Sequence, residues 1–405
     1  MDVLVAHNFY QQAGGEDQVM AAEVAVLKAH EHNVIQYRIH NNSINAMHRL
    51  GAASRTIWNG HNFHELRQLP QTHRPQIAHF HNTFPLISPA GYYAARAENI
   101  PVVQTVHNFR LLCPNALLFR AGEVCEDCVA KTIPWPGIIH KCYRDSFAAT
   151  SAVAAMLGAH RAMGTWRNAI DVYIALTEFS RNKLIEGGLP AEKITLKSNF
   201  VDPDPGAGSG VGGYVVFIGR LSVEKGLDTL LGAWRHLRGK LPLKIIGDGP
   251  MAAKVKEAAA KDAAIQWLGA KPLAAVYEAI GEAIALVLPS QCYENFPRVI
   301  AEAFAKGTPV LASGHGAMAQ IVENGHTGLL FRPGDAADLA EKLESILADP
   351  IRLSRMRQAA REQFLLNFTA ETNYRTLMAI YEKALGARAQ GSSPNSRTPT
   401  AAGIA

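Results

Sequence analysis

The sequence predicts an α/β protein with two doubly wound, Rossmann-like domains. Short apolar runs alternate with longer amphipathic stretches along most of the chain, which indicates parallel sheets covered by helices. The 405 residues are enough for two domains that each bury a core. The alternating units form two sets on either side of a Pro- and Gly-rich stretch, which favours two domains over a single α/β barrel.

The apolar runs give the expected strands and the amphipathic stretches the expected helices. In the first set, strands are expected at 2–6, 33–37, 77–81, 101–106 and 172–176, and helices at 17–30, 89–98 and 178–187. In the second set, strands are expected at 214–219, 243–247, 284–289, 308–312 and 328–331, and helices at 226–238, 251–260, 298–306 and 336–348.

The boundary between the sets is marked by residues 199–213, where a Pro-containing run leads into a Gly cluster. We expect a first domain at 1–200 with an irregular insertion at 111–144, a linker at 201–213, and a second domain at 214–388. The last helix is expected to pack back on the first domain. Residues 389–405 have no apolar period, which predicts a disordered tail.

Composition narrows the class of protein. Apolar residues make up 48% of the chain and charged residues 19%, which is typical of globular proteins. The net charge of +5 suits anionic substrates, an anionic membrane surface or simply a solvated surface, and it is too small to indicate nucleic acid. No apolar run reaches the roughly 18 residues of a membrane span, and the first residues resemble a strand rather than a signal peptide. We therefore expect a cytoplasmic protein, with most histidines on the surface or in loops.

Glu294 and Glu302, separated by seven residues, follow the apolar run at 283–289. Pro297 suits the first position of a helix that Glu294 or Asn295 can cap, so Glu294 is expected in a loop and Glu302 in the helix. Two carboxylates near a helix N-terminus at a strand's end suit a ligand with many hydroxyls and an anionic group, such as a sugar nucleotide. The plain alternative for Glu302 is an exposed helical residue.

Two cations follow the strand expected at 214–219. Arg220 and Lys225 can grip a diphosphate there, since open α/β sheets bind ligands at the carboxyl ends of strands. Gly219 allows close approach of the backbone, and the turns at Gly247 and Leu268 could line a pocket for a base and a ribose. The alternatives are a surface loop with two solvated cations and ordinary glycine turns.

Taken in order, these pieces resemble the retaining glycosyltransferases of family 4, which have the two-domain GT-B fold with a cleft between the domains. The resemblance covers about residues 1–385 and implies transfer of a sugar from a nucleoside-diphosphate donor to a glycan or lipid-linked acceptor, in the biosynthesis of cell-surface polysaccharide. The matching residues are Gly219-Arg220-Leu221, Lys225-Gly226, Gly247-Asp248-Gly249-Pro250, Pro289-Ser290, Glu294-Asn295-Phe296-Pro297, Glu302-Ala303, Gly307-Thr308-Pro309-Val310 and Asn324-Gly325-His326-Thr327-Gly328-Leu329-Leu330.

The resemblance also implies roles for these residues. Arg220 and Lys225 would neutralise the departing nucleoside diphosphate. Glu302 would bind its ribose and Glu294 the hydroxyls of the donor sugar. Amides around the Asn295-Phe296-Pro297 segment would lie near the phosphates. Fixed cations and a helix N-terminus can stabilise the charge of the leaving group, so no cofactor is expected to be required for catalysis.

One position departs from the family pattern. The family often has Glu in the helix after the Gly314–Gly316 loop, and this chain has Gln320. The departure concerns how the donor sugar is held and leaves the expected fold unchanged.

The first half of the chain contains fewer specific motifs, so its part of the site is harder to predict from the sequence. Gly14 and Gly15 precede a helix, so their amides can approach an anion, and in the resembled family this loop borders donor and acceptor. His107 ends a strand near the donor sugar in that family. His81 and Asn82 end another strand and would line the acceptor side. His107 could instead be the general base of an inverting enzyme, whereas the resemblance favours retention.

Four cysteines lie in the irregular insertion. Cys125 and Cys128 have the spacing of a metal knuckle, and Cys113 and Cys142 complete a set of four thiolate ligands. In a cytosolic protein a structural Zn²⁺ is favoured over disulfides, and uncoordinated reduced thiols are the third alternative.

The insertion also carries apolar residues, at 117–119 and 133–139, beside several cations. They could contact an anionic membrane, at the inner face of the cytoplasmic membrane, where a lipid-linked acceptor would lie. The alternative, which we favour from the sequence, is that they pack beneath the insertion itself.

Two other functions fit part of the pattern. One is a catalytically silent protein that binds sugar nucleotides or acts as a scaffold, and the other is a different GT-B enzyme such as a sugar-nucleotide epimerase. The charged set of Arg220, Lys225, Glu294 and Glu302 argues against both. The sequence therefore predicts a retaining, hexosyltransferase-type enzyme.

Overall fold

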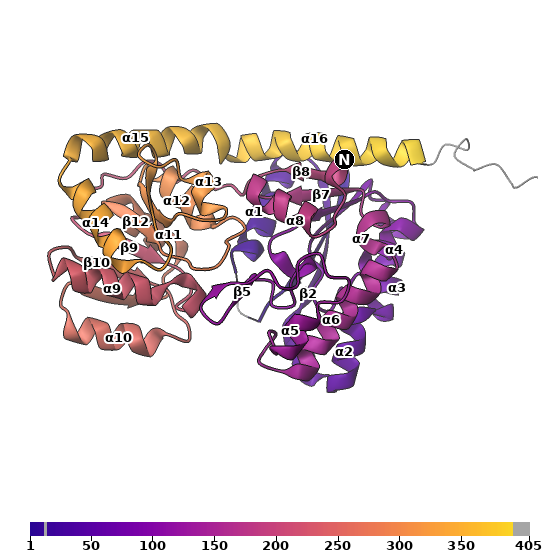
Figure 1. Ribbon diagram of the computed structural model, residues 1–405. Coiled ribbons are helices and arrows are strands. Elements are labelled where there is room, and N and C mark those ends of the chain that lie inside the picture. Colours follow the sequence, from indigo (N-terminus) through magenta and orange to yellow (C-terminus); the bar gives the residue numbers. More distant parts are fainter. Residues whose placement is uncertain (12–13, 392–405) are drawn as a thin grey trace, which may run out of the picture.

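The computed structural model describes residues 1–11 and 14–391, which form two α/β domains (Figure 1). The first sheet has the order β2-β1-β3-β4-β7-β8 and contains β1 (Asp2–Phe9), β2 (Asn33–His40), β3 (Ile77–Asn82), β4 (Val102–Thr105), β7 (Val172–Ala175) and β8 (Ile194–Leu196). Every neighbouring pair in it is parallel.

The second sheet is also parallel throughout, in the order β11-β10-β9-β12-β13-β14. Its strands are β9 (Val215–Ile218), β10 (Leu243–Ile246), β11 (Ile265–Gly269), β12 (Ala285–Leu288), β13 (Val310–Ser313) and β14 (Gly328–Phe331). The central strands are buried on both faces, as their unbroken apolar sequences require of a sheet covered by helices on both sides. The predicted fold of two doubly wound sheets is confirmed.

Helices cover both sheets. In the first domain they are α1 (Gly15–Ala29), α2 (Arg49–Ile57), α3 (Gly60–His73), α4 (Ala90–Ala97), α5 (Trp135–Ile139), α6 (Phe147–Ala162), α7 (Thr165–Asn168) and α8 (Glu178–Glu186), with short 3₁₀ turns η1 (Asn41–Ala46), η2 (Phe109–Leu111) and η3 (Ala191–Lys193). A hairpin of β5 (Phe119–Arg120) and β6 (Glu123–Val124) lies in the insertion.

In the second domain the helical elements are η4 (Val223–Lys225), α9 (Leu227–Leu237), α10 (Ala252–Lys261), α11 (Leu273–Glu282), α12 (Arg298–Ala305), α13 (Met318–Ile321), α14 (Ala336–Leu347) and α15 (Pro350–Asn367). The strands expected from the sequence do not include β8, whose three residues are too few for an apolar period to show, nor β11 and the two-residue β5 and β6. The expected helices do not include α2, α3, α5, α6, α7, α11, α13 and α15.

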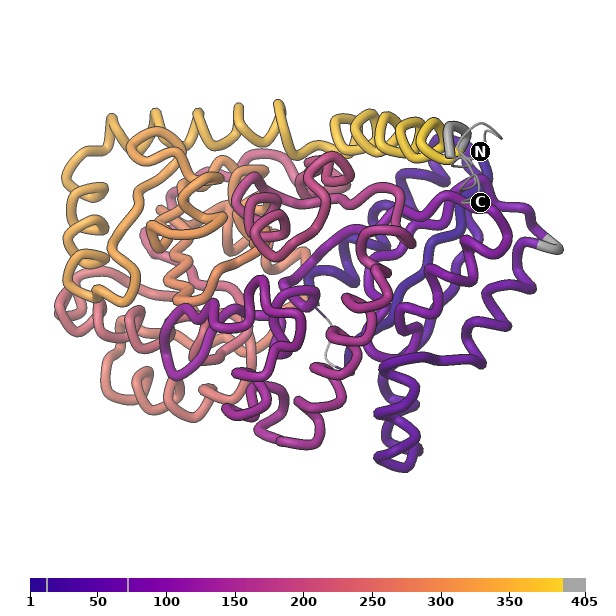
Figure 2. Tube along the Cα trace, turned by 45° about the vertical axis from the view of Figure 1, so that its right-hand side comes forward, coloured from indigo at the N-terminus to yellow at the C-terminus, as the bar shows by residue number. Residues whose placement is uncertain are grey.

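The last helix, α16 (Ala370–Gly391), continues from α15 and crosses to the first domain, as Figures 1 and 2 show. Its Leu377, Ile380 and Tyr381 pack in one buried cluster with Val3 and Val103 of the first sheet. The helix extends through residue 391, so the tail predicted to begin at 389 starts within a helix instead, because polar residues do not stop a helix that is already anchored. The rest of that tail lies outside the described residues. None of the helices described here is long and apolar enough to cross a bilayer.

We predict that Trp234→Ala strongly destabilises the second domain. The ring is fully buried in α9, and its indole N–H donates to the Leu241 carbonyl at 2.7 Å. Removing an aromatic side chain from such a site costs about 3–5 kcal/mol. Urea denaturation gives the unfolding free energy. The matched control is Trp135→Ala, whose ring is 54% exposed and whose loss should change that energy by under about 0.5 kcal/mol. Equal effects of the two substitutions would contradict the packing described.

Candidate functional site

The two sheets face each other with the edges that are formed by the carboxyl ends of their parallel strands. In the second sheet the strand order reverses between β9 and β12, and in the first between β1 and β3; ligands of open α/β sheets bind at such points. Segments that follow strands of the two sheets are bonded to each other across the domains. The Asn295 amide, after β12, donates to the Val106 carbonyl, after β4, at 2.6 Å. The backbone N–H of Phe179 donates to Gln320 Oε1, also at 2.6 Å.

The loops after β9 and β12 bring a cation and a carboxylate together. Gly226 makes this possible, because a Cβ there would lie 1.8 Å from the Pro289 carbonyl oxygen and its φ is +71°. Lys225 Nζ lies 2.6 Å from Glu294 Oε1, and the Ser290 hydroxyl donates to the same oxygen at 2.6 Å. Burial raises the pKa of the Glu294 carboxyl, but Lys225 and Ser290 outweigh it and hold the pKa below its usual value. The pair is therefore ionised.

The other residues predicted around this edge surround the pair. Arg220 is exposed directly after β9. The turns after β9 and β10 touch through their backbones, since a Cβ on Gly247 would lie 1.9 Å from the Gly219 carbonyl oxygen. The Trp267 indole N–H donates to the Gly247 carbonyl at 3.0 Å, and the adjacent Leu268 packs on the second domain's core. The structure thus brings all of these turns to one edge.

The predicted start of the helix after β12 is wrong in detail. α12 begins at Arg298, so Pro297 precedes its first residue, and no side chain caps it. Glu294 and Asn295 cannot cap it, because Lys225 and Val106 already engage them. The next residue, Phe296, is buried with its ring 5.6 Å from that of Phe368. The segment before the helix is therefore fixed by contacts with both domains.

Glu302 is not the exposed helical residue that was the plain alternative. Its side chain is 8% exposed, and its Oε1 lies 3.5 Å from Arg298 Nε. Burial raises the pKa of the carboxyl, which the neighbouring Arg298 opposes. Arg298 also bonds the Gln18 side chain of α1 across the domains. In this closed arrangement, Glu302 faces a protein cation rather than open solvent.

A line of polar side chains runs inward from the loop after β4. His107 Nε2 lies 3.0 Å from His81 Nδ1, and His81 Nε2 lies 3.2 Å from Glu23 Oε2. Glu23 in turn pairs with the ammonium of Lys197. Burial alone would raise the pKa of Glu23, but Lys197 and then His81 hold it well below its usual range. A buried ion pair thus lies behind His107. His79 and His81 are among the few buried histidines, whereas most histidines are exposed, as expected.

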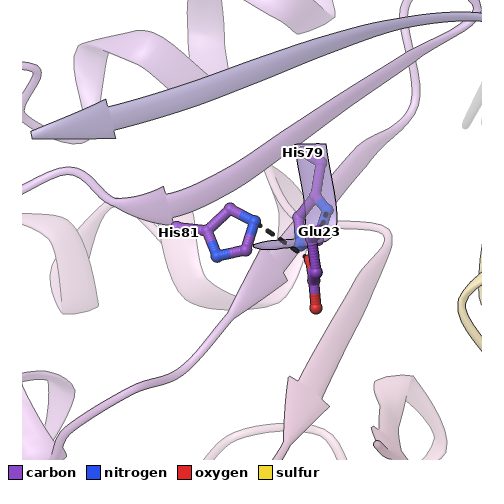
Figure 3. A group of neighbouring side chains, drawn as sticks. All are labelled: Glu23, His79 and His81. Carbon is purple, nitrogen blue, oxygen red and sulfur yellow. Dashed lines mark ion pairs between the residues drawn. The ribbon is translucent and has the colours of Figure 1, made fainter. Parts of the chain in front are cut away.

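Figure 3 shows Glu23, His79 and His81 close enough together to suggest a metal site, with their ligand atoms within 4.8 Å of one another. The chemistry does not fit a cation. The ammonium of Lys197 already occupies one oxygen of Glu23. Both ring nitrogens of His79 are bonded, to the Tyr381 hydroxyl at 2.9 Å and to Thr105 Oγ1 at 2.8 Å. The group is a hydrogen-bonded network that ties α16 to the sheet.

The network fixes the protonation of His107. The ionised Glu23 favours the proton of His81 on Nε2, which leaves His81 Nδ1 to accept from the Nε2–H of His107. The remaining nitrogen of His107, Nδ1, is then an acceptor. Burial holds the pKa of His107 well below its usual range, so the ring is neutral near pH 7. A neutral imidazole of this kind accepts a hydrogen bond from a hydroxyl but is a poor general base.

The loop after β1 lies beside these residues. The Gly14 N–H donates to the Asp17 carboxylate at 2.9 Å, and α1 begins at Gly15. Asn82 donates to the Asn8 carbonyl at 2.6 Å and to Glu16 Oε1 at 3.3 Å, so it braces this loop from the end of β3. Its amide is therefore committed to protein partners.

Three residues of the site were not predicted from the sequence: Glu23, Lys197 and Arg298. Glu23 alone had a visible signal, since it occupies the apolar face of α1 with Met20, Val24 and Leu27. A carboxylate on such a face requires a buried partner. The partner, Lys197, is 174 positions away, and only the fold brings it near.

Two family models match the chain, "Glycosyltransferase Family 4" at residues 22–205 and "Glycosyl transferases group 1" at residues 211–363. Among curated proteins, the glycogen synthase of Mycobacterium tuberculosis is 32% identical over 191 residues, 46% of this chain and 45% of the relative. The amylovoran biosynthesis glycosyltransferase AmsK of Erwinia amylovora is 28% identical over 236 residues, 53% and 56% of the two chains. The match thus spans about half the length of these relatives.

Among solved structures, Anabaena Alr3699/HepE in complex with UDP superposes with a TM-score of 0.68 and 17% identity. The superposition covers 94% of this chain and all of that one. At this identity the likeness establishes the fold.

We predict that Glu23→Gln destabilises the first domain by about 3–5 kcal/mol, because it leaves the Lys197 ammonium buried without a counter-charge. The double variant Glu23→Gln/Lys197→Met removes both charges and should recover much of this loss. Equilibrium denaturation measures both. A Glu23→Gln protein as stable as the parent chain would mean that the buried pair is not ionised.

Proposed function

We propose that this chain, which has the GT-B fold and matches both glycosyltransferase family models, is a glycosyltransferase that uses a nucleoside-diphosphate sugar as donor and retains the configuration of the transferred sugar. The acceptor in this proposal is a glycan or a lipid-linked glycan of cell-surface polysaccharide. Relatives named for polysaccharide biosynthesis and the complex of the Anabaena protein with UDP-glucose support the proposal.

One observation carries the proposal. The loop that holds the Lys225–Glu294 pair continues directly into Asn295, which is bonded to Val106 beside His107. The diphosphate-binding charges of one domain and the neutral imidazole of the other therefore belong to one continuous arrangement. A nucleotide-binding site in the second domain alone would not need this connection.

The charges act on the leaving group. A diphosphate entering beside β9 competes with Glu294 for the Lys225 ammonium, while the exposed Arg220 adds a bidentate donor. Glu294, released from Lys225, then accepts hydrogen bonds from hydroxyls of the donor sugar. Both cations are fixed before the bond breaks, so they stabilise the negative charge that develops on the diphosphate. The reaction in this proposal requires no added divalent metal.

His107 holds the sugar rather than removing a proton. Its lowered pKa and its free Nδ1 acceptor suit a hydrogen bond from a donor-sugar hydroxyl. The acceptor's proton passes instead to an oxygen of the departing diphosphate, on the same face of the sugar. Attack and departure on one face give retention. Glu302 binds the ribose in this scheme once Arg298 turns from it, and Gly15 borders the donor phosphates.

The acceptor side includes an exposed apolar surface on the insertion, which we call the insertion ridge: Ile133, Trp135, Ile139 and Phe147. Ile133, Trp135 and Ile139 are more than half exposed, so the expectation that the apolar residues pack beneath the insertion is wrong for these three, although Leu118 and Phe119 are buried. Phe147, just beyond the insertion, is also more than half exposed. Ile133 precedes α5, Trp135 and Ile139 lie on α5, and Phe147 begins α6, which contacts α5. Lys131, Lys141 and Arg144 flank them. We propose that the ridge rests on an anionic membrane leaflet that presents a lipid-linked acceptor.

The donor is tested by thermal shift with UDP, GDP and ADP, followed by transfer assays with the matching nucleotide sugars. One nucleotide at about 100 times its Kd should add about 2.7 kcal/mol of stability, and transfer should give a product of the donor's anomeric configuration by NMR. Lys225→Met should lower kcat about 10²- to 10³-fold, whereas the exposed Lys256→Met should not. Binding without turnover would indicate a silent binding protein. An inverted product would exclude the retaining mechanism.

We predict that the full chain sediments with vesicles containing phosphatidylglycerol and far less with pure phosphatidylcholine. Trp135→Ala/Ile139→Ser should reduce the bound fraction about tenfold or more, since it removes much of the apolar area of the ridge. Leu366→Ser is the matched control, because Leu366 is 69% exposed on α15 in the other domain. Equal binding by both variants would place the membrane contact elsewhere.

A further inference from the structure

Four cysteines that the proposed function does not use line one small cavity in the insertion. Cys113 follows η2, Cys125 and Cys128 follow the β5–β6 hairpin, and Cys142 follows α5. All of them are free thiols. We propose that these four sulfurs bind a single structural Zn²⁺ ion. The ion would order the part of the insertion that contacts the donor-binding loop, by which we mean the loop after β12 that contains Tyr293 and Glu294.

The segment needs such an ion because its backbone provides little order. Between η2 and α6 the regular structure consists of a hairpin of two-residue strands and the five-residue α5. Isolated elements of this length are not stable in water. Only a few of its side chains, Leu112, Leu118 and Val129 among them, enter the core of the first domain. A tetrahedral ion would join the hairpin, the turn after η2 and the end of α5 directly.

The charges around the cavity suit a zinc–thiolate centre. On coordination each thiol releases its proton to solvent, and Zn²⁺ with four thiolates carries a net charge of −2. Arginines lie close enough to act electrostatically on three of the sulfurs: Arg110 on Cys113, Arg120 on Cys142 and Arg161 on Cys128. They would balance that charge.

The close packing of α5 against the segment that contains Cys128 allows the four sulfurs to approach one another. A Cβ on Gly137 would lie 3.5 Å from Cys128 Sγ and 2.9 Å from Pro114, so glycine allows α5 to approach the knuckle. Among the described residues, the groups with three ligand atoms within 4.8 Å of one another lie elsewhere. The four sulfurs are therefore more widely spaced than zinc ligands, and binding would require them to move inward.

The segment between Cys125 and Cys128, the metal knuckle, also contacts the donor-binding loop through Glu126. Glu126 lies between Cys125 and Cys128, and its carboxylate is 2.7 Å from Lys183 Nζ of α8. Lys183 Nζ lies 5.8 Å from the ring centroid of Tyr293, and burial together with Glu126 raises the pKa of the Tyr293 hydroxyl. Tyr293 immediately precedes Glu294. An ion that fixes the knuckle therefore fixes one neighbour of the donor loop, a consequence that rests on the proposed function.

The test is the metal content of the full-length chain, purified without chelators and without a metal-affinity column. Elemental analysis should find about one zinc per chain. Cys125→Ser and Cys142→Ser should each lose it, whereas Cys292→Ser, which removes the buried fifth cysteine outside the insertion, should keep it. The content does not depend on any nucleotide, so its outcome is separate from that of the proposed function.

A second measurement covers variants that fail to fold. Titration of the parent chain with a mercurial should release one zinc, read with a chromogenic chelator, as about four thiols react. Metal-free protein whose four insertion thiols react freely would overturn the proposal in favour of reduced thiols. Loss of two thiols per disulfide, seen by mass spectrometry, would overturn it in favour of disulfide bonds.

Discussion

Both sheets are purely parallel, and this constraint determines where every site residue lies. A parallel strand can be followed by another only through a crossover, so the loops that leave the strands collect at one edge of each sheet. The two edges are then held together by a few polar bonds, of which Asn295 to Val106 is the most central. Residues as distant in sequence as His107 and Glu294 become parts of one site through that bond.

Two buried ion pairs have different consequences. Lys197 and Glu23 are almost wholly buried and have further protein partners, so the pair is a fixed support for His81 and His107. Lys225 and Glu294 are more exposed, with side chains 25% and 12% accessible. Separating charges is less costly where water or an incoming anion can replace the lost partner. The first pair therefore stabilises the fold, whereas the second can exchange partners when a diphosphate binds.

The sequence predicted the second domain's part of the site more fully than the first's. Arg220, Lys225, Glu294 and the glycine turns follow apolar strands directly, so local pattern and strand direction place them. Glu23 and Lys197 could not be paired in advance, because nothing local links an α1 carboxylate to a lysine after β8. The cap at Glu294 or Asn295 was wrong for a similar reason. Tertiary partners took both side chains, and local rules for helix starts do not include such competition.

The chain passes between the two domains twice, near residue 200 and near residue 369, and the contacts at these two crossings are more extensively buried than the contacts between the domains at the site. Phe200 and Val201 are buried, Val201 pairs with Thr369, and Asn373 donates to the Ser198 carbonyl at 3.0 Å, so the two crossings are fastened to each other. At the site, the domains meet through single polar bonds and through the rings of Phe179 and Tyr293, whose centroids lie 4.7 Å apart. Polar interdomain contacts of this kind separate more readily than apolar ones. Any separation of the two domains at the site would break the bond between Asn295 and Val106 and so release the loop that holds Glu294.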